Sequence, residues 1–163
     1  MRYEDAYRDW LRRLHEELNY PDPDDPPPWT REVFEANGEL PAERFAWLAF
    51  DRRLRDIGEA FTRVSATARA HTGIDVPAHL HVEEPCEQFP VGGVSFDGSA
   101  IWSAEPPEVH VDVAEAVQTY LADRHRTVWP LCATHRTGTH PRVSDGRPVW
   151  WCHPGGHAPA PIT

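Results

Sequence analysis

The sequence contains no lysine, so all sixteen of its basic residues are arginines, and it has only two asparagines. Alanine, proline and glycine are abundant instead. This composition is typical of a bacterial genome of high GC content or of one of its phages. It concerns codon usage and carries no information about mechanism.

Long apolar segments are also missing. No stretch approaches the run of about 18 apolar residues that marks a transmembrane helix, which excludes a membrane span of that kind. The N-terminal segment Met1–Asp5 is charged and lacks the apolar region of a secretory signal, so we expect a cytoplasmic protein. In that compartment, a cluster of cysteine and histidine is more often a metal site than a disulfide.

Familiar catalytic motifs do not occur. The sequence has no Gly-x-Ser-x-Gly nucleophile elbow, no P-loop, no dinucleotide-binding fingerprint and no His-Glu-x-x-His helix. Cys86 lies among the acidic residues of Glu83–Glu87, where neighbouring negative charges disfavour the nucleophilic thiolate. We therefore assign no catalytic residue and favour a non-enzymatic protein.

Basic residues are unevenly distributed. Residues 71–123 contain no arginine and ten acidic residues, a charge of −10, whereas residues 124–163 contain five arginines against Asp145 alone, a charge of +4. The acidic segment would repel phosphate, which argues against nucleic-acid binding there. The basic tail is expected to face the acidic segment within the same molecule.

Residues 1–73 are predicted to form a helical hairpin with a proline-rich connection. Apolar residues recur every three or four positions over residues 3–18, as on one face of an amphipathic helix. Five prolines in residues 20–28 predict a stiff, extended connection. Thr30 is expected to cap a short helix that ends at Asn37.

A longer helix is predicted from Pro41 to about Ala70. Its apolar residues repeat at alternating steps of three and four, which is the spacing of a seam that packs against another helix. We expect the first helix to be its partner, and a homodimer through the helix of residues 47–68 is the competing use. The seam consists of Trp47, Phe50, Leu54, Ile57, Phe61, Val64 and Ala68.

Residues 74–126 are predicted to form an acidic segment of short strands followed by a helix. Asp97 and Gly98 are a strong signal for a two-residue hairpin turn. Asp112 and Glu115 have the spacing of a capping box, which predicts that the helix begins there.

The most distinctive chemistry lies in residues 127–163, where cysteine and histidine form two pairs. Cys132 and His135 are three positions apart, Cys152 and His157 are five apart, and an Asp-Gly hairpin turn is predicted between the pairs. Thiolate and imidazole are ligands that zinc prefers, and two pairs at one end of a hairpin can supply four tetrahedral positions. Four protein ligands would close the site and make a bound Zn²⁺ structural.

This arrangement resembles a zinc ribbon or a related zinc-knuckle module over residues 128–163, and the resemblance implies a structural zinc. It departs from the usual pattern, because ribbon knuckles are commonly Cys-x2-Cys, whereas each pair here has one cysteine and one histidine. On spacing alone His140 can replace His135 as a ligand, and His153 would need a strained turn to reach the same metal. The alternatives are a tail whose cysteines are small buried apolar residues and a redox pair of cysteines.

Two further patterns suggest other functions. His79 and His81 lie on one face of a predicted strand, so with a nearby carboxylate they could hold a second metal in a metal-dependent hydrolase or oxygenase. Trp129, Trp150 and Trp151 lie near the arginines of the tail, as in sites that bind single-stranded nucleic acid. The simpler interpretation is that these tryptophans supply the core of the small zinc module.

The sequence therefore predicts an α+β protein with an N-terminal helical hairpin, a small antiparallel sheet, one further helix and a C-terminal zinc-knuckle hairpin. We expect a small cytoplasmic zinc-binding protein that acts through another protein in an accessory or regulatory role, without a membrane or a nucleic acid.

Overall fold

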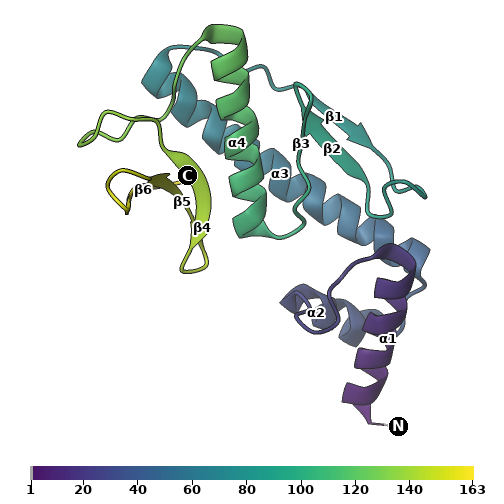
Figure 1. Cartoon of the computed structure of the whole chain (residues 1–163). Coiled ribbons are helices and arrows are strands. Elements are labelled where there is room, and N and C mark those ends of the chain that lie inside the picture. The colour runs from purple at the N-terminus through teal and green to yellow at the C-terminus, as the bar shows by residue number, and fades with distance from the viewer. Residues whose placement is uncertain (1) are drawn as a thin grey trace. The chain divides into compact units, whose positions relative to one another are not determined.

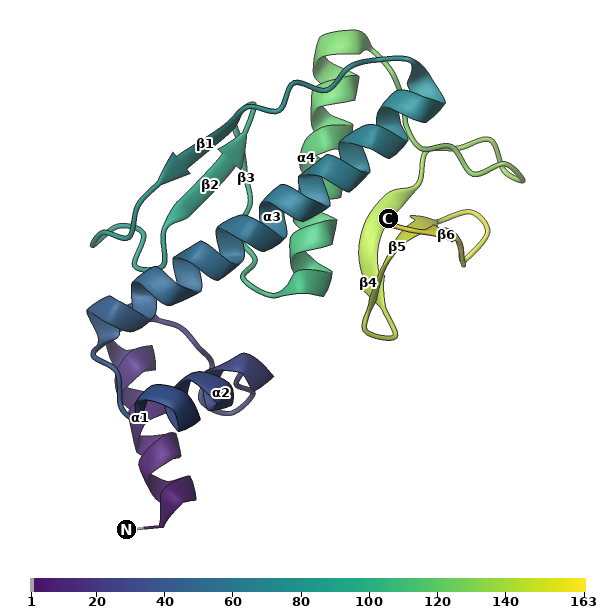
Figure 2. The ribbon, with the colours of Figure 1, turned by 180° about the vertical axis from the view of Figure 1, so that it is seen from behind.

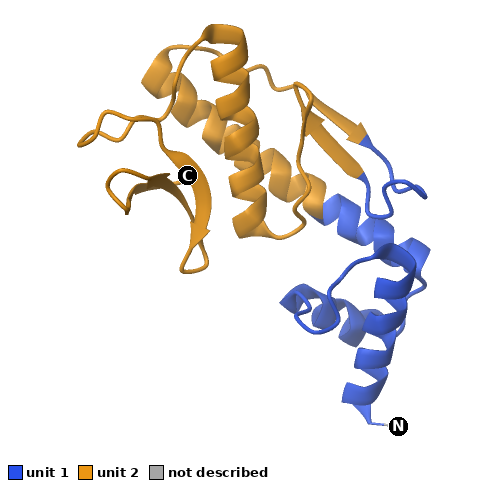
Figure 3. Ribbon diagram, viewed as in Figure 1, with its two compact units in different colours: residues 1–52, 83–92 blue, residues 53–82, 93–163 orange. Residues whose placement is uncertain are grey.

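The computed structural model describes residues 2–163 and confirms the expected α+β class. Within these residues it contains four helices and two antiparallel sheets of three strands each (Figure 1). The chain divides into two compact units, one of Met1–Arg52 and Glu83–Gly92 and the other of Arg53–Val82 and Gly93–Thr163 (Figure 3). The long helix α3 (Ala42–Thr72) contributes its first third to one unit and the remainder to the other.

None of the helices within residues 2–163 combines the length and the apolar content that crossing a lipid bilayer requires.

The first unit is built around aromatic side chains of α1 (Tyr3–Leu18), α2 (Pro28–Asn37) and the start of α3. The indole of Trp10 is buried and donates a hydrogen bond to the Leu40 carbonyl at 2.9 Å. The bounds of α1 are those that the apolar periodicity predicts. The proline-rich connection is bent rather than extended, because the Asp22 carboxylate accepts the Asp24 backbone N–H at 2.9 Å and closes a local turn.

The expected capping role of Thr30 is wrong. Helix α2 begins two residues earlier, with Pro27 at the N-cap and Pro28 in the first turn. Proline suits this position because its missing N–H would have no partner in the helix. Thr30 is buried instead, and its hydroxyl donates to the Pro27 carbonyl at 2.7 Å and lies 2.6 Å from the Tyr7 hydroxyl.

The second unit has the remainder of α3 and helix α4 (Pro106–His125) at its centre, with one sheet on each side of this helix pair (Figures 1 and 2). The predicted seam of α3 is buried at Ile57, Phe61 and Val64, but its partner there is not the first helix. These residues share a core with α4 and with both sheets, so the expected pairing with α1 is wrong for this part of the seam. The periodicity of a helix identifies its apolar face but not the element that packs against that face.

The first sheet has the order β1 (Leu80–Glu83), β2 (Gly93–Phe96) and β3 (Ser99–Ala100). The predicted hairpin is confirmed, since Phe96 pairs with Ser99 across Asp97 and Gly98, both of which have positive φ.

The capping box predicted at Asp112 is wrong, because α4 begins six residues earlier, at Pro106. The Asp112 carboxylate accepts the backbone N–H groups of Trp102 and Ser103 at 2.9 and 2.8 Å and so fixes the loop after β3. The capping-box spacing is a weak signal when a proline pair that can also begin a helix precedes it.

The second sheet has the order β4 (His140–Ser144), β5 (Arg147–Cys152) and β6 (His157–Pro161). The predicted hairpin of β4 and β5 is confirmed, with Ser144 paired to Arg147. Strand β6 has no counterpart in the sequence-based prediction, because two of its five residues are prolines and its apolar pattern is weak.

The tail is joined to the rest of the second unit by tryptophan and glutamine. Trp129 and Trp150 are buried with their ring centroids 5.0 Å apart, and both belong to the core that includes α3 and α4. The Gln118 amide of α4 donates to the carbonyls of Trp129 and Thr139 at 2.8 and 2.7 Å. These bonds hold the chain on either side of the first Cys/His pair.

Candidate metal centre

The first pair of candidate ligands sits on a tight turn. The Arg136 N–H donates to the Cys132 carbonyl at 2.7 Å, and the Cys132 N–H donates to the Thr137 carbonyl at 2.9 Å. Arg136 has a φ of +54°, in the left-handed region, which lets the chain reverse directly after His135. The turn therefore brings the His135 ring back over the buried thiol of Cys132.

The second pair lies where β5 turns into β6. Cys152 is fully buried and pairs with His157 across the two strands, next to an irregularity in the ladder at Trp150. The turn between the pair contains Gly155 and Gly156, of which Gly156 has a φ of +56°. A Cβ atom on Gly155 would lie 2.7 Å from His157 Nε2 and still closer to the nearest carbons of His135 and His157, so only glycine fits between the two imidazoles.

The four side chains converge on one point. Their ligand atoms all lie within 4.8 Å of one another, so the cluster could hold a metal ion. The Cys132 sulfur lies 3.5 Å from His135 Nδ1 and 3.5 Å from His157 Nε2, and the Cys152 sulfur lies 3.4 Å from His135 Nδ1. In a tetrahedral zinc site, bond lengths of about 2.3 Å to sulfur and about 2.05 Å to nitrogen place sulfur and nitrogen about 3.6 Å apart.

The two thiols compete for one imidazole nitrogen. The Nδ1 atom of His135 is within reach of both sulfurs, yet a neutral imidazole nitrogen has one lone pair or one hydrogen. A cation at the centre would be within reach of all four candidate ligand atoms at once.

The electrostatics favour the ligand form of at least one cysteine. Hydrogen bonds, first from the backbone at His135 and then from the His135 side chain and Cys152, lower the pKa of the Cys132 thiol to about 6, although burial opposes this shift. A thiolate is the form that binds a metal. The Thr137 hydroxyl lies 3.9 Å from the Cys152 sulfur, which gives that sulfur a polar neighbour outside the cluster.

The spare histidines of the tail lie outside this cluster. His140 begins β4 and its ring faces that of His153, with 5.9 Å between the centroids. Of the two candidates that spacing left open, it is therefore His135 that stands with the cysteines and His157.

His79 and His81 do not belong to a comparable cluster. Within residues 2–163, the C-terminal group is the one set of three or more His, Cys, Asp or Glu side chains with converging ligand atoms. Both histidines are exposed. Cys86 is exposed and also lies outside the cluster.

The tryptophans of the tail are mostly covered. Trp129 and Trp150 are each 5% exposed and belong to the core of the second unit, so neither presents a ring on the outer surface for stacking on nucleic-acid bases. Trp151 is half-buried, and the Arg142 guanidinium lies 4.2 Å from its ring centroid. The tryptophans serve as core residues, as the simpler interpretation of the sequence has it.

Two residues that matter for the site were not identified from the sequence. Gly155 belongs to a Gly-Gly pair directly before His157. Such a pair in the sequence could have indicated that the backbone passes too close to a candidate ligand for a side chain to fit. Gln118 gave no signal, because its role depends on where α4 meets the tail.

Comparison with known proteins identifies no match for this chain. No protein-family model, curated protein or solved structure matches the chain.

Proposed function

We propose that this chain is a small zinc-binding protein in which one Zn²⁺, held by Cys132, His135, Cys152 and His157, stabilises the C-terminal module. The observation that carries this proposal is the convergence of two sulfur and two nitrogen atoms within 4.8 Å of one another, with three sulfur–nitrogen distances of 3.4–3.5 Å. A tetrahedral set of two sulfurs and two nitrogens favours zinc over harder metals. Four protein ligands leave no open position for a substrate, so the role of the ion is structural.

We expect folding of the tail to depend on the bound metal. The two pairs lie on separate turns, and both sulfurs are buried. A bound ion joins these turns and contributes its binding free energy to the folded state. Small modules of this kind depend on metal because their own apolar core is limited.

The test is elemental analysis of the purified chain together with matched substitutions. We expect one zinc per chain in the wild type and in Cys86→Ser, whose thiol is exposed and outside the cluster. Cys152→Ser should lose the zinc. His135→Ala should lose it as well, and His140→Ala should keep it. A wild type without zinc, or a Cys152→Ser variant that retains it, would contradict the proposal.

We further propose that the protein acts by binding another protein. Trp102 supports this role, because it is 75% exposed although its own backbone N–H is anchored to Asp112. A rigidly presented tryptophan is the commonest kind of energetic centre in protein interfaces. It lies in the segment of residues 71–123 with a charge of −10, which favours a partner with a basic surface.

A photoreactive amino acid at position 102 tests this second role. We expect a defined cross-linked product in extracts of the source cells that is absent when the photoreactive residue replaces the exposed Arg44 of α3. Identical products from both positions, or none from either, would argue against a partner at this surface. A hydrolase activity that disappears when His79 and His81 are replaced would refute the non-enzymatic role.

A further inference from the structure

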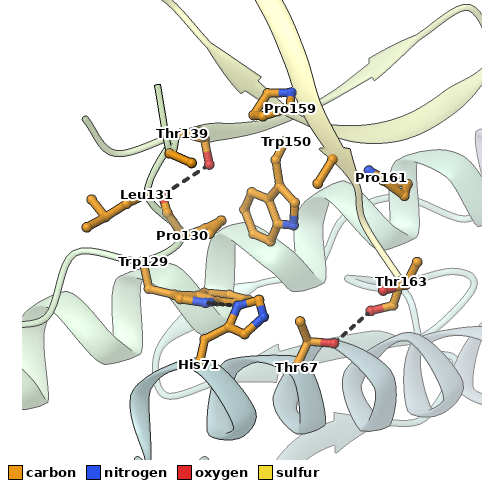
Figure 4. A pocket seen from close by; sticks show the side chains of 12 residues that line it. Thr67, His71, Trp129, Pro130, Leu131, Thr139, Trp150, Pro159, Pro161 and Thr163 are labelled. Atoms are coloured by element: carbon orange, nitrogen blue, oxygen red, sulfur yellow. Dashed lines mark hydrogen bonds between the residues drawn. The ribbon is translucent and has the colours of Figure 1, made fainter. Parts of the chain in front are cut away.

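A cavity of about 390 Å³ lies in the second unit (Figure 4), and its lining residues Leu131 and Ala133 flank Cys132 of the candidate metal centre. Pro130 and Leu131 stand on one side of it, Pro161 and Thr163 on the other, and α3 forms its base. Its volume falls in the range of roughly 300–1,000 Å³ that is typical of small-molecule sites. No residue of this cavity is used by the metal centre itself.

Both sides of the cavity belong to segments that the metal would fix. Leu131 and Ala133 flank Cys132, and Pro159 lies two residues after His157. The two pairs of candidate ligands connect these segments, so the positions of the ligands set the distance between the two sides of the cavity. Zinc binding would therefore determine the width of the cavity, and the inference rests on the proposed function in this respect.

The lining is aromatic and apolar. The rings of Trp129 and Trp150 meet edge to face, at an interplanar angle of 74°, and three prolines lie around them. None of the lining residues is an aspartate, glutamate, lysine or arginine. Such walls favour a flat aromatic ligand and offer no counterion for a highly charged group such as a phosphate ester.

One hydrogen-bond donor is directed at the ligand space. The Trp129 indole N–H donates to His71 Nδ1 at 3.1 Å. Because an indole N–H can only donate, Nδ1 accepts and the neutral His71 ring carries its hydrogen on Nε2. This second nitrogen is turned away from Trp129, toward the space beneath Trp150 (Figure 4). The hydroxyls of Thr67 and Thr139 already donate to backbone carbonyls.

We propose that this cavity binds a small, uncharged planar aromatic molecule carrying a carbonyl oxygen, and that binding requires the zinc-loaded tail. The aromatic body lies against Trp129, Trp150 and the prolines. Its oxygen accepts a hydrogen bond from Nε2 of His71. The walls select shape, and Nε2 of His71 selects the acceptor group.

The experiment uses 2-acetonaphthone as the probe and 2-isopropenylnaphthalene as its matched control, in titration calorimetry with the full zinc-loaded chain. Both molecules are uncharged and have the same bicyclic body, but the control lacks the carbonyl oxygen. We expect saturable binding of 2-acetonaphthone and about tenfold weaker binding of the control. His71→Ala should weaken binding of 2-acetonaphthone about tenfold, and His71→Gln, which keeps a donor, should restore part of the loss.

Two threonines of α3 supply a further matched pair. Thr67 lines the cavity and Thr62 does not, and the side-chain hydroxyl of each is exposed and bonds to the preceding turn of the helix. Thr67→Trp should abolish binding of 2-acetonaphthone by filling the space, whereas Thr62→Trp should leave it unchanged. Removal of zinc with a chelator should abolish it too.

Several results would overturn the inference. They are the absence of saturable 2-acetonaphthone binding to the zinc-loaded chain, equal binding by Thr67→Trp, and equal binding by the metal-free chain. A zinc-loaded chain that fails to bind the probe contradicts the cavity alone, whereas a chain without zinc in elemental analysis contradicts the proposed function.

Discussion

Replacement of Gly155 by alanine should damage the metal centre although it substitutes none of the four candidate ligands. The added Cβ would lie within 3.0 Å of atoms of both His135 and His157, whereas ordinary contacts begin near 3.4 Å. The nearest ring carbons of His157 and His135 would lie 2.3 and 2.4 Å from this Cβ, so the rings would have to move by about 1 Å. Zinc–ligand distances tolerate about 0.2 Å, so at least one imidazole would leave the metal.

The size of the effect follows from this comparison. Substitutions that disturb only the surroundings of zinc ligands cost about 10- to 100-fold in affinity. Gly155→Ala displaces the ligands themselves, so we expect a loss of at least about a hundredfold, or about 2.7 kcal/mol. The metal-free chain should change little, because free imidazoles can swing aside.

Gly156→Ala is the matched control for this prediction. Gly156 has a φ of +56° and no atom within 4 Å of the position of an added Cβ. Alanine there meets backbone strain of about 1 kcal/mol but no ligand, so stability should fall while zinc affinity stays within a few-fold of the wild type. Competition with a chromogenic chelator measures both affinities. Equal zinc binding by Gly155→Ala and the wild type would refute the proposed geometry of the site.

Two further substitutions test the structure around the site and the exposed tryptophan. Arg136→Gly should raise stability by about 0.5–1 kcal/mol, because glycine adopts the φ of +54° without strain, and thermal unfolding should show no gain for Arg136→Ala, which keeps the strain. Asp112→Ala should cost about 1–2 kcal/mol in urea unfolding, because the N–H groups of Trp102 and Ser103 lose their acceptor, and Asp112→Asn should retain most of the stability. An Asp112→Ala chain as stable as the wild type would contradict this prediction, because water would then replace the carboxylate as acceptor at no cost in the free energy of unfolding.

The elements that the sequence predicted well are those whose signals are local. The hairpin turn after Phe96 needs two residues that tolerate positive φ, and Asp97 and Gly98 are those residues. Helix α1 is marked by one apolar face and by its amphipathic period. The same is true of the two ligand pairs, since a cysteine and a histidine a few residues apart can meet on one turn.

The wrong predictions of helix caps share one cause, because tertiary contacts compete with local sequence signals for the same side chains. Thr30 and Asp112 have the side chains of helix caps, but each is used for a longer-range bond, to Tyr7 and to Trp102 respectively. Prolines earlier in the chain begin both helices in their place. No property of a single segment reveals which partner a short polar side chain will find.

Strand β6 shows why the metal centre could be anticipated only in part. His157 is a ligand candidate from spacing, yet its position depends on a proline-rich strand that pairs with β5 and carries no strand signal of its own. Pairing places Cys152 opposite His157, and the glycine turn then folds the imidazole over the buried sulfur. The choice of His135 over His140 has the same origin: the knuckle turns His135 inward, whereas His140 begins β4 and faces His153. The spacing of the sequence thus identifies candidate ligands, but which of them converge is a property of the folded sheet.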